Sequence, residues 1–69
     1  MANYKAIGNR IVSAEYPGYV WDVAVCDQPT AAIRLLHEAY ALNERQKYTA
    51  SARMLHQVEQ LPGFAWVNR

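Results

Sequence analysis

Residues 27–41, DQPTAAIRLLHEAYA, carry the clearest structural signal in the chain. Asp27 or Gln28 suits a helix N-cap, and Pro29 is tolerated in the first turn because its missing N–H would have no partner there. From Pro29 onward, apolar residues recur with the 3.6-residue period of an α-helix. The resulting apolar arc is formed by Ala32, Ile33, Leu35, Leu36, Ala39 and Tyr40. The pattern predicts a helix that packs this arc against a core.

A second helix is predicted from about Glu44 to Gln60, before the break at Leu61-Pro62-Gly63. Asn43 is a favoured cap, and Gln46 three residues later completes a capping-box pattern. The apolar arc of this helix holds Tyr48, Met54, Leu55, Val58 and Leu61, with Ser51 in its middle. The short connection would make the two helices antiparallel. One long bent helix is the alternative, since neither Gly nor Pro occurs between Pro29 and Gln60.

The residues before the first helix are typical of β-strands. We expect one strand over Asn9–Glu15, a turn at Tyr16-Pro17-Gly18 and a second strand over Tyr19–Cys26. Alternation in this second strand assigns Tyr19, Trp21, Val23 and Val25 to the core face, and Val20, Asp22, Ala24 and Cys26 to the other face. Residues 4–7 could form a further short strand that turns at Gly8-Asn9. Residues 64–67 either add a last strand or pack as an arm.

These elements predict one α+β domain over residues 1–69, with a short antiparallel hairpin or sheet packed on two antiparallel helices. The core would lie between Trp21, Val23 and Val25 on the sheet and Ile33, Leu36 and Tyr40 on the first helix. A domain of 69 residues has a small core, and its single cysteine excludes an internal disulfide. Binding to a larger partner, or formation of a homodimer, is therefore expected to add stability.

Charge and hydropathy restrict the cellular location and the class of partner that we expect. The net charge is +1, which is not typical of a general polyanion binder. No apolar run approaches the roughly 20 residues of a membrane span, and the N-terminus lacks the apolar stretch of a signal peptide. One unpaired cysteine suits a reducing compartment, so the cytoplasm is the expected location.

The sequence contains no pattern that predicts a catalytic, cofactor or metal site. His37-Glu38 begins like a zinc-protease helix motif, but Ala41 stands where the second histidine is required. His56 lies on the polar arc of the second helix, so both histidines are interpreted as solvated surface groups. Cys26 is interpreted as a structural thiol. No phosphate-binding glycine loop and no nucleophile motif occurs, and we expect no enzyme activity.

Two sets of side chains are candidates for binding a partner. The first set is aromatic, because Tyr and Trp are enriched at the energetic centres of interfaces. It comprises Tyr16, Tyr19, Phe64 and Trp66, with Tyr4 nearby in the predicted fold. The second set is a basic stripe on the outer face of the second helix that could meet phosphates or an acidic protein surface. It comprises Arg45, Arg53 and His56, with Lys47 at its edge.

The run Trp21-Asp22-Val23-Ala24-Val25-Cys26, followed by Asp27-Gln28-Pro29-Thr30-Ala31-Ala32 opening an amphipathic helix, resembles small bacteriophage-encoded proteins. These proteins pair a short hairpin with one or two helices and include anti-CRISPR and related anti-defence inhibitors. The resemblance covers about residues 10–42 and is architectural, so it transfers no functional residue. It implies a protein that binds a large protein or nucleoprotein complex in the host cytoplasm and blocks its site. The alternative function is a small nucleic-acid-binding regulator that uses the basic stripe.

Overall fold

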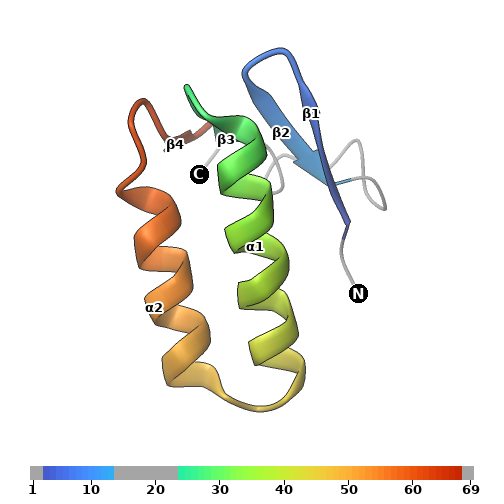
Figure 1. Cartoon of the computed structure of the whole chain (residues 1–69), viewed down its shortest axis with the longest axis vertical. Coiled ribbons are helices and arrows are strands. Elements are labelled where there is room, and N and C mark those ends of the chain that lie inside the picture. Colours follow the sequence, from blue (N-terminus) through green and yellow to red (C-terminus); the bar gives the residue numbers. More distant parts are fainter. Residues whose placement is uncertain (1–2, 14–23, 68–69) are drawn as a thin grey trace.

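In the part of the chain that the structure describes, four short strands and two helices make up this α+β domain (Figure 1). The computed structural model describes residues 3–13 and 24–67. The elements follow one another as β1 (Tyr4–Ile7), β2 (Arg10–Ser13), β3 (Ala24–Val25), α1 (Pro29–Glu44), α2 (Tyr48–Glu59) and β4 (Ala65–Trp66). The predicted strand over Tyr19–Cys26 is observed only at its end, because residues 14–23 lie outside the described part of the chain.

The strands form one antiparallel sheet in the order β1-β2-β3-β4. The turn at Gly8-Asn9 joins β1 to β2, and Gly8 has a φ of 64°, which favours glycine there. The C-terminal residues add a strand, since Ala24 pairs with Trp66 and Val25 with Ala65. Both short outer strands that the sequence left open are therefore present.

The core face of the sheet is the opposite of the one predicted for β3. Ala24 and Cys26 are fully buried, whereas Val25 is half-buried. Ala24 pairs with the buried Ile11, and residues opposite one another in an antiparallel pair share a face. The larger side chain of Val25 suggested the wrong face, because alternation cannot assign a strand in which both faces are apolar. Trp21 and Val23, the other predicted core residues, lie outside the described residues.

Helix α1 packs on this face mainly through small and medium side chains. Ala32, Leu36 and Ala39 are buried, and Leu36 contributes to one cluster with Ile11 and Val58. The predicted apolar arc is therefore correct at its centre. Tyr40, at the edge of the same arc, keeps 37% of its surface exposed.

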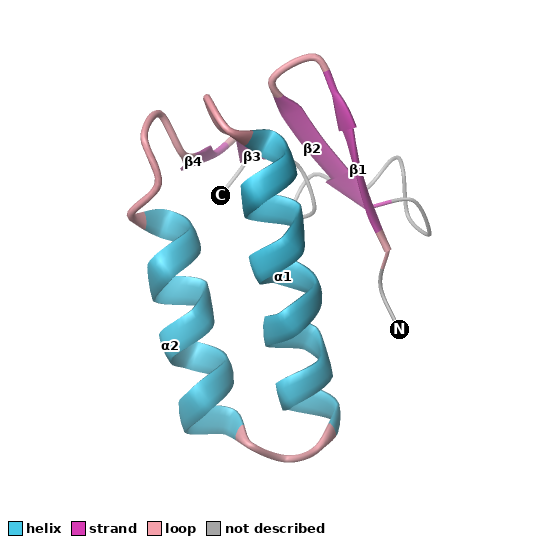
Figure 2. Cartoon of the chain, in the orientation of Figure 1, coloured by secondary structure: helices cyan, strands magenta, loops and turns pink. Residues whose placement is uncertain are grey.

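The two helices are separate and antiparallel, and they are joined at one end of the molecule (Figure 2). The prediction of two helices is confirmed, and the alternative of one long bent helix is wrong. The predicted cap at Asn43 is wrong, because Asn43 lies inside α1, and α2 begins at Tyr48 rather than at about Glu44. Instead, Gln46 N–H donates to the Asn43 carbonyl (3.0 Å) and Lys47 N–H donates to the Leu42 carbonyl (2.9 Å). These two bonds form a Schellman motif that ends α1. Gln46 occupies the left-handed position of the motif, with a φ of 62°.

The opposite ends of the helices are fastened together next to the sheet. Asp27 N–H donates to the Pro62 carbonyl (3.2 Å), and the Cys26 thiol contacts the same oxygen at 3.8 Å. Gly63 has a φ of 69° and lies so close to Asp27 that a Cβ atom would come within 2.5 Å of its carboxylate. The chain therefore leaves the sheet after β3 and returns to it before β4 at almost the same point.

Candidate functional site

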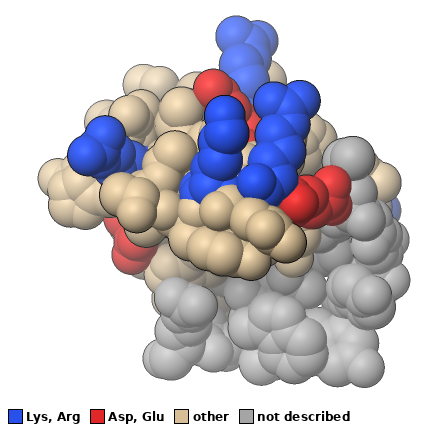
Figure 3. Space-filling view, turned by 90° about the horizontal axis from the view of Figure 1, so that it is seen from below, with Lys and Arg blue, Asp and Glu red and all other residues tan. Residues whose placement is uncertain are grey.

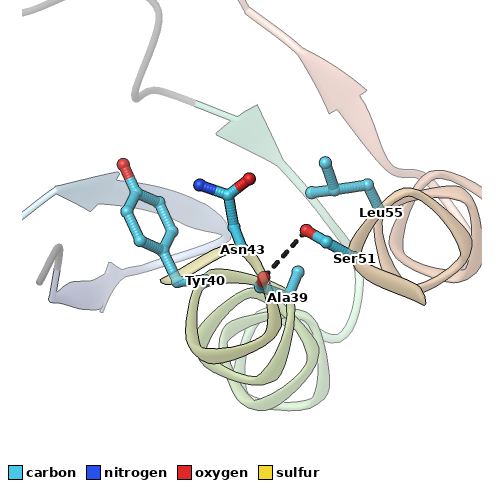
Figure 4. A pocket seen from close by; sticks show the side chains of 5 residues that line it. All are labelled: Ala39, Tyr40, Asn43, Ser51 and Leu55. Atoms are coloured by element: carbon cyan, nitrogen blue, oxygen red, sulfur yellow. Dashed lines mark hydrogen bonds between the residues drawn. The ribbon is translucent and has the colours of Figure 1, made fainter. Parts of the chain in front are cut away.

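A pocket of about 250 Å³ lies between α1 and α2, towards the ends that are joined to each other. Its lining comes from both helices and consists of Ala39, Tyr40, Asn43, Ser51 and Leu55 (Figure 4). Tyr40 and Leu55 stand at its two sides, and Asn43 lies between them. The pocket therefore has apolar walls and one amide group at its rim.

The floor of the pocket is closed by a hydrogen bond between the helices. The Ser51 hydroxyl donates to the Ala39 carbonyl at 2.8 Å, and Ser51 is only 6% exposed. Serine and alanine are small, so the two helices approach each other closely at this point. The serine hydroxyl therefore takes part in a hydrogen bond that links α2 to α1.

Large side chains are exposed towards the joined ends of the helices: Tyr40 and Leu55 at 37%, and Tyr48 at 60%. At 1.5 Å per residue, α1 is about 24 Å long, whereas the four residues of β1 span about 13 Å. β1 can therefore lie along only part of α1.

Basic side chains gather at the same end of the molecule (Figure 3). Arg45, Lys47, Arg53 and His56 are all exposed, as the sequence predicted for this stripe. Arg45 and Lys47 belong to the connection at the joined ends, so they do not lie on the second helix as predicted. Arg53 lies midway along α2, and His56 lies in its last turn, away from the joined ends. Within the described ranges, no carboxylate forms an ion pair with Arg45, Lys47 or Arg53.

The predicted aromatic site residues in the described part of the chain do not form an exposed patch. Phe64 and Trp66 are half-buried, pack against the core and contact each other edge-on, with ring centroids 5.2 Å apart. Tyr4 is also half-buried and makes an edge contact with Tyr40 at 6.1 Å. Tyr16 and Tyr19 lie outside the described residues. The exposed aromatic surface at the joined ends comes from Tyr40 and Tyr48, which the periodicity had assigned to the apolar arcs.

The two histidines lie on the surface of the helices, and the cysteine lies in the core. His37 and His56 are exposed on their helices, and the Nε2 atom of His37 accepts a hydrogen bond from Tyr4 N–H at 3.2 Å. Cys26 is fully buried, and its sulfur accepts a bond from Gln28 N–H at 3.4 Å. In the portion of the chain that is described, no three His, Cys, Asp or Glu residues come together in a way that could hold a metal ion.

None of the described helices is long and apolar enough to cross a membrane. Comparison with protein-family models, with curated proteins and with solved structures finds no match for the chain.

Proposed function

We propose that the protein binds another protein, without catalysing a reaction, through the face of its helical hairpin (α1, α2 and their connection) that the sheet leaves uncovered. The observation that carries this proposal is the pocket between the helices, with Tyr40 and Leu55 at its sides and Tyr48 close by. Exposed aromatic and aliphatic side chains around a depression are the usual anchors of protein interfaces. The polar side-chain groups of the lining are the Asn43 amide, the Tyr40 phenol and a Ser51 hydroxyl already bonded to Ala39, and they suit recognition better than turnover.

The finer form of the proposal is a bacteriophage-encoded inhibitor of a bacterial defence complex of the CRISPR-Cas type, acting in the host cytoplasm. Its support is the architectural resemblance at residues 10–42, together with the small size of the chain. A small rigid helical face that fills a groove on a large complex can block that complex without any chemistry.

Affinity capture tests the proposal. The wild-type chain and a Tyr48→Ala/Leu55→Ala variant would serve as paired baits in bacterial lysates, with circular dichroism confirming that both are folded. We expect at least one protein retained in stoichiometric amount by the wild type and lost with the variant. Equal recovery by both baits would place the interface elsewhere on the surface. Recovery of no protein by the wild type would count against a protein-binding function.

A nucleic-acid-binding regulator is the second candidate, and one observation favours it. Arg45 is exposed in the connection between the helices, and Arg53 and His56 are exposed further along α2, so phosphates could reach all three. This function requires binding that weakens steeply as salt increases, because counterions are released from the nucleic acid. A gel shift at low salt tests it, and absence of any retardation would exclude it.

A further inference from the structure

Exposed basic side chains lie beside the pocket between α1 and α2, and no carboxylate of the described residues forms an ion pair with them. Arg45 and Lys47 are exposed in the connection, and the Lys47 carbonyl accepts a hydrogen bond from Ser51 N–H at 3.0 Å. The connection between the helices therefore lies next to Ser51, at the floor of the pocket. The first turn of α2 contains no acidic residue and has no side-chain cap, so the positive end of its dipole adds to the charge of these side chains.

We infer that the pocket receives a large apolar side chain from an acidic segment of a partner protein, whose carboxylates meet Arg45 and Lys47. The inference rests on the proposed protein-binding function and specifies the chemistry of the partner. The charge complementarity selects an acidic segment, and the lining of the pocket selects the apolar anchor.

The lining favours an apolar anchor for two reasons. Tyr40 and Leu55 present exposed carbon surface on both sides, and Ala39 is a buried wall. The Ser51 hydroxyl already donates to the Ala39 carbonyl, so a polar anchor would find no free donor on the floor. The Asn43 amide at the rim has no hydrogen-bond partner among the described residues, and it can bond the backbone of a bound segment.

A second copy of this chain fits the same face less well. A two-fold axis that passes close to the connection would bring Arg45 and Lys47 of both copies together, and like charges across an interface are unfavourable. The described face also offers only three large exposed apolar side chains, Tyr40, Tyr48 and Leu55. A stable dimer usually buries more than about 1,000 Å² with a substantial apolar centre.

Nuclear magnetic resonance of the isotope-labelled full chain tests the inference. The probes are synthetic peptides of about 11 residues, or three helical turns, with several carboxylates around a central Leu or Phe. Matched peptides replace the carboxylates with Lys, or the central residue with Ser. We expect the acidic apolar peptides to shift the amide signals of Asn43, Ser51 and Leu55. Replacing the central residue should weaken binding about tenfold or more, since that side chain leaves water on binding.

Charge reversal provides the second arm. Arg45→Glu/Lys47→Glu should weaken binding of the acidic peptides about tenfold at low salt, and the difference should shrink as salt screens the charges. The control is Arg10→Glu/Arg34→Glu, which makes the same change in charge at the start of β2 and in the first half of α1, away from the joined ends (Figure 1). It should bind the peptides nearly as well as the wild type.

Several results would overturn the inference. Equal binding of the Lys-substituted peptides would remove the charge argument, and equal weakening by the control variant would show only an effect of net charge. The amide signals of Asn43 and Ser51 could instead shift with protein concentration in the absence of peptide, and this result would identify a second copy as the occupant. If only a short RNA shifts these signals, the occupant is a nucleic acid. If the acidic peptides fail while affinity capture still depends on Leu55, the protein-binding function stands and this inference about the partner fails.

Discussion

Replacing Gln46 with glycine should make the protein more stable. Gln46 is the one non-glycine residue with a positive φ in the described chain, and its value of 62° is close to those of Gly8 and Gly63. An L-residue adopts this left-handed conformation at a cost of about 1–2 kcal/mol. Glycine avoids that cost but loses more freedom on folding, about 0.5–1 kcal/mol. The net gain for Gln46→Gly is therefore about 0.5–1 kcal/mol.

Thermal and urea unfolding, followed by circular dichroism, would measure this gain. For a domain of this size, 1 kcal/mol corresponds to about 4–8 °C in Tm. The matched control is Gln57→Gly, which makes the same chemical change on the exposed side of α2. Glycine is unfavourable in a helix, so the control should lose about 0.5–1 kcal/mol. The two substitutions should thus have opposite signs. A Gln46→Gly variant that is neutral or less stable than the wild type would refute the Schellman geometry at the end of α1.

Two further substitutions test the core and the fastening of the helices. Leu36→Ala, at a side chain that is 1% exposed, should lower the free energy of unfolding by about 2–5 kcal/mol. Leu55→Ala, at 37% exposure, should cost clearly less, and equal losses in urea unfolding would show that the core is misplaced. Gly63→Ala should cost about 1 kcal/mol more than Gly8→Ala. Both glycines have positive φ, but only at Gly63 must the Asp27 carboxylate rotate away from the new methyl group; identical Tm values for the two variants would argue against that contact.

The helices and the first hairpin could be predicted because their signals are local. The 3.6-residue period from Pro29 gave the correct start of α1, and the turn at Gly8-Asn9 gave the β1-β2 pair. The end of α1 was missed, because Asn43 suits a helix cap while nothing in the sequence marks Gln46 as left-handed. Glycine is the usual residue at such a position, and its absence hid the boundary.

The core face of β3 and the pocket depend on contacts between distant segments. Val25 and Ala24 are both apolar, and only the pairing of Ala24 with Ile11 and Trp66 decides which of them is buried. The pocket is formed by residues of both helices, and only the packing of α1 on α2 decides which of them line it. The sequence did not indicate it, because the predicted strands of seven and eight residues would be about as long as the helices.

The pairing of β3 with β4, next to the hydrogen bond between Asp27 and Pro62, has a consequence for the order in which the elements fold. β3 and β4 are neighbours in the sheet, yet the whole helical hairpin separates them along the chain. Bringing these two strands together in the unfolded chain costs much conformational entropy, because a long loop must be closed. Contacts between the two helices close only a short connection and therefore form quickly. We expect the helical hairpin to form first and to bring residues 24–25 and 65–66 together. Pulse-labelling hydrogen exchange should then show amides in the middle of α1 and α2 protected before the amides of β3 and β4.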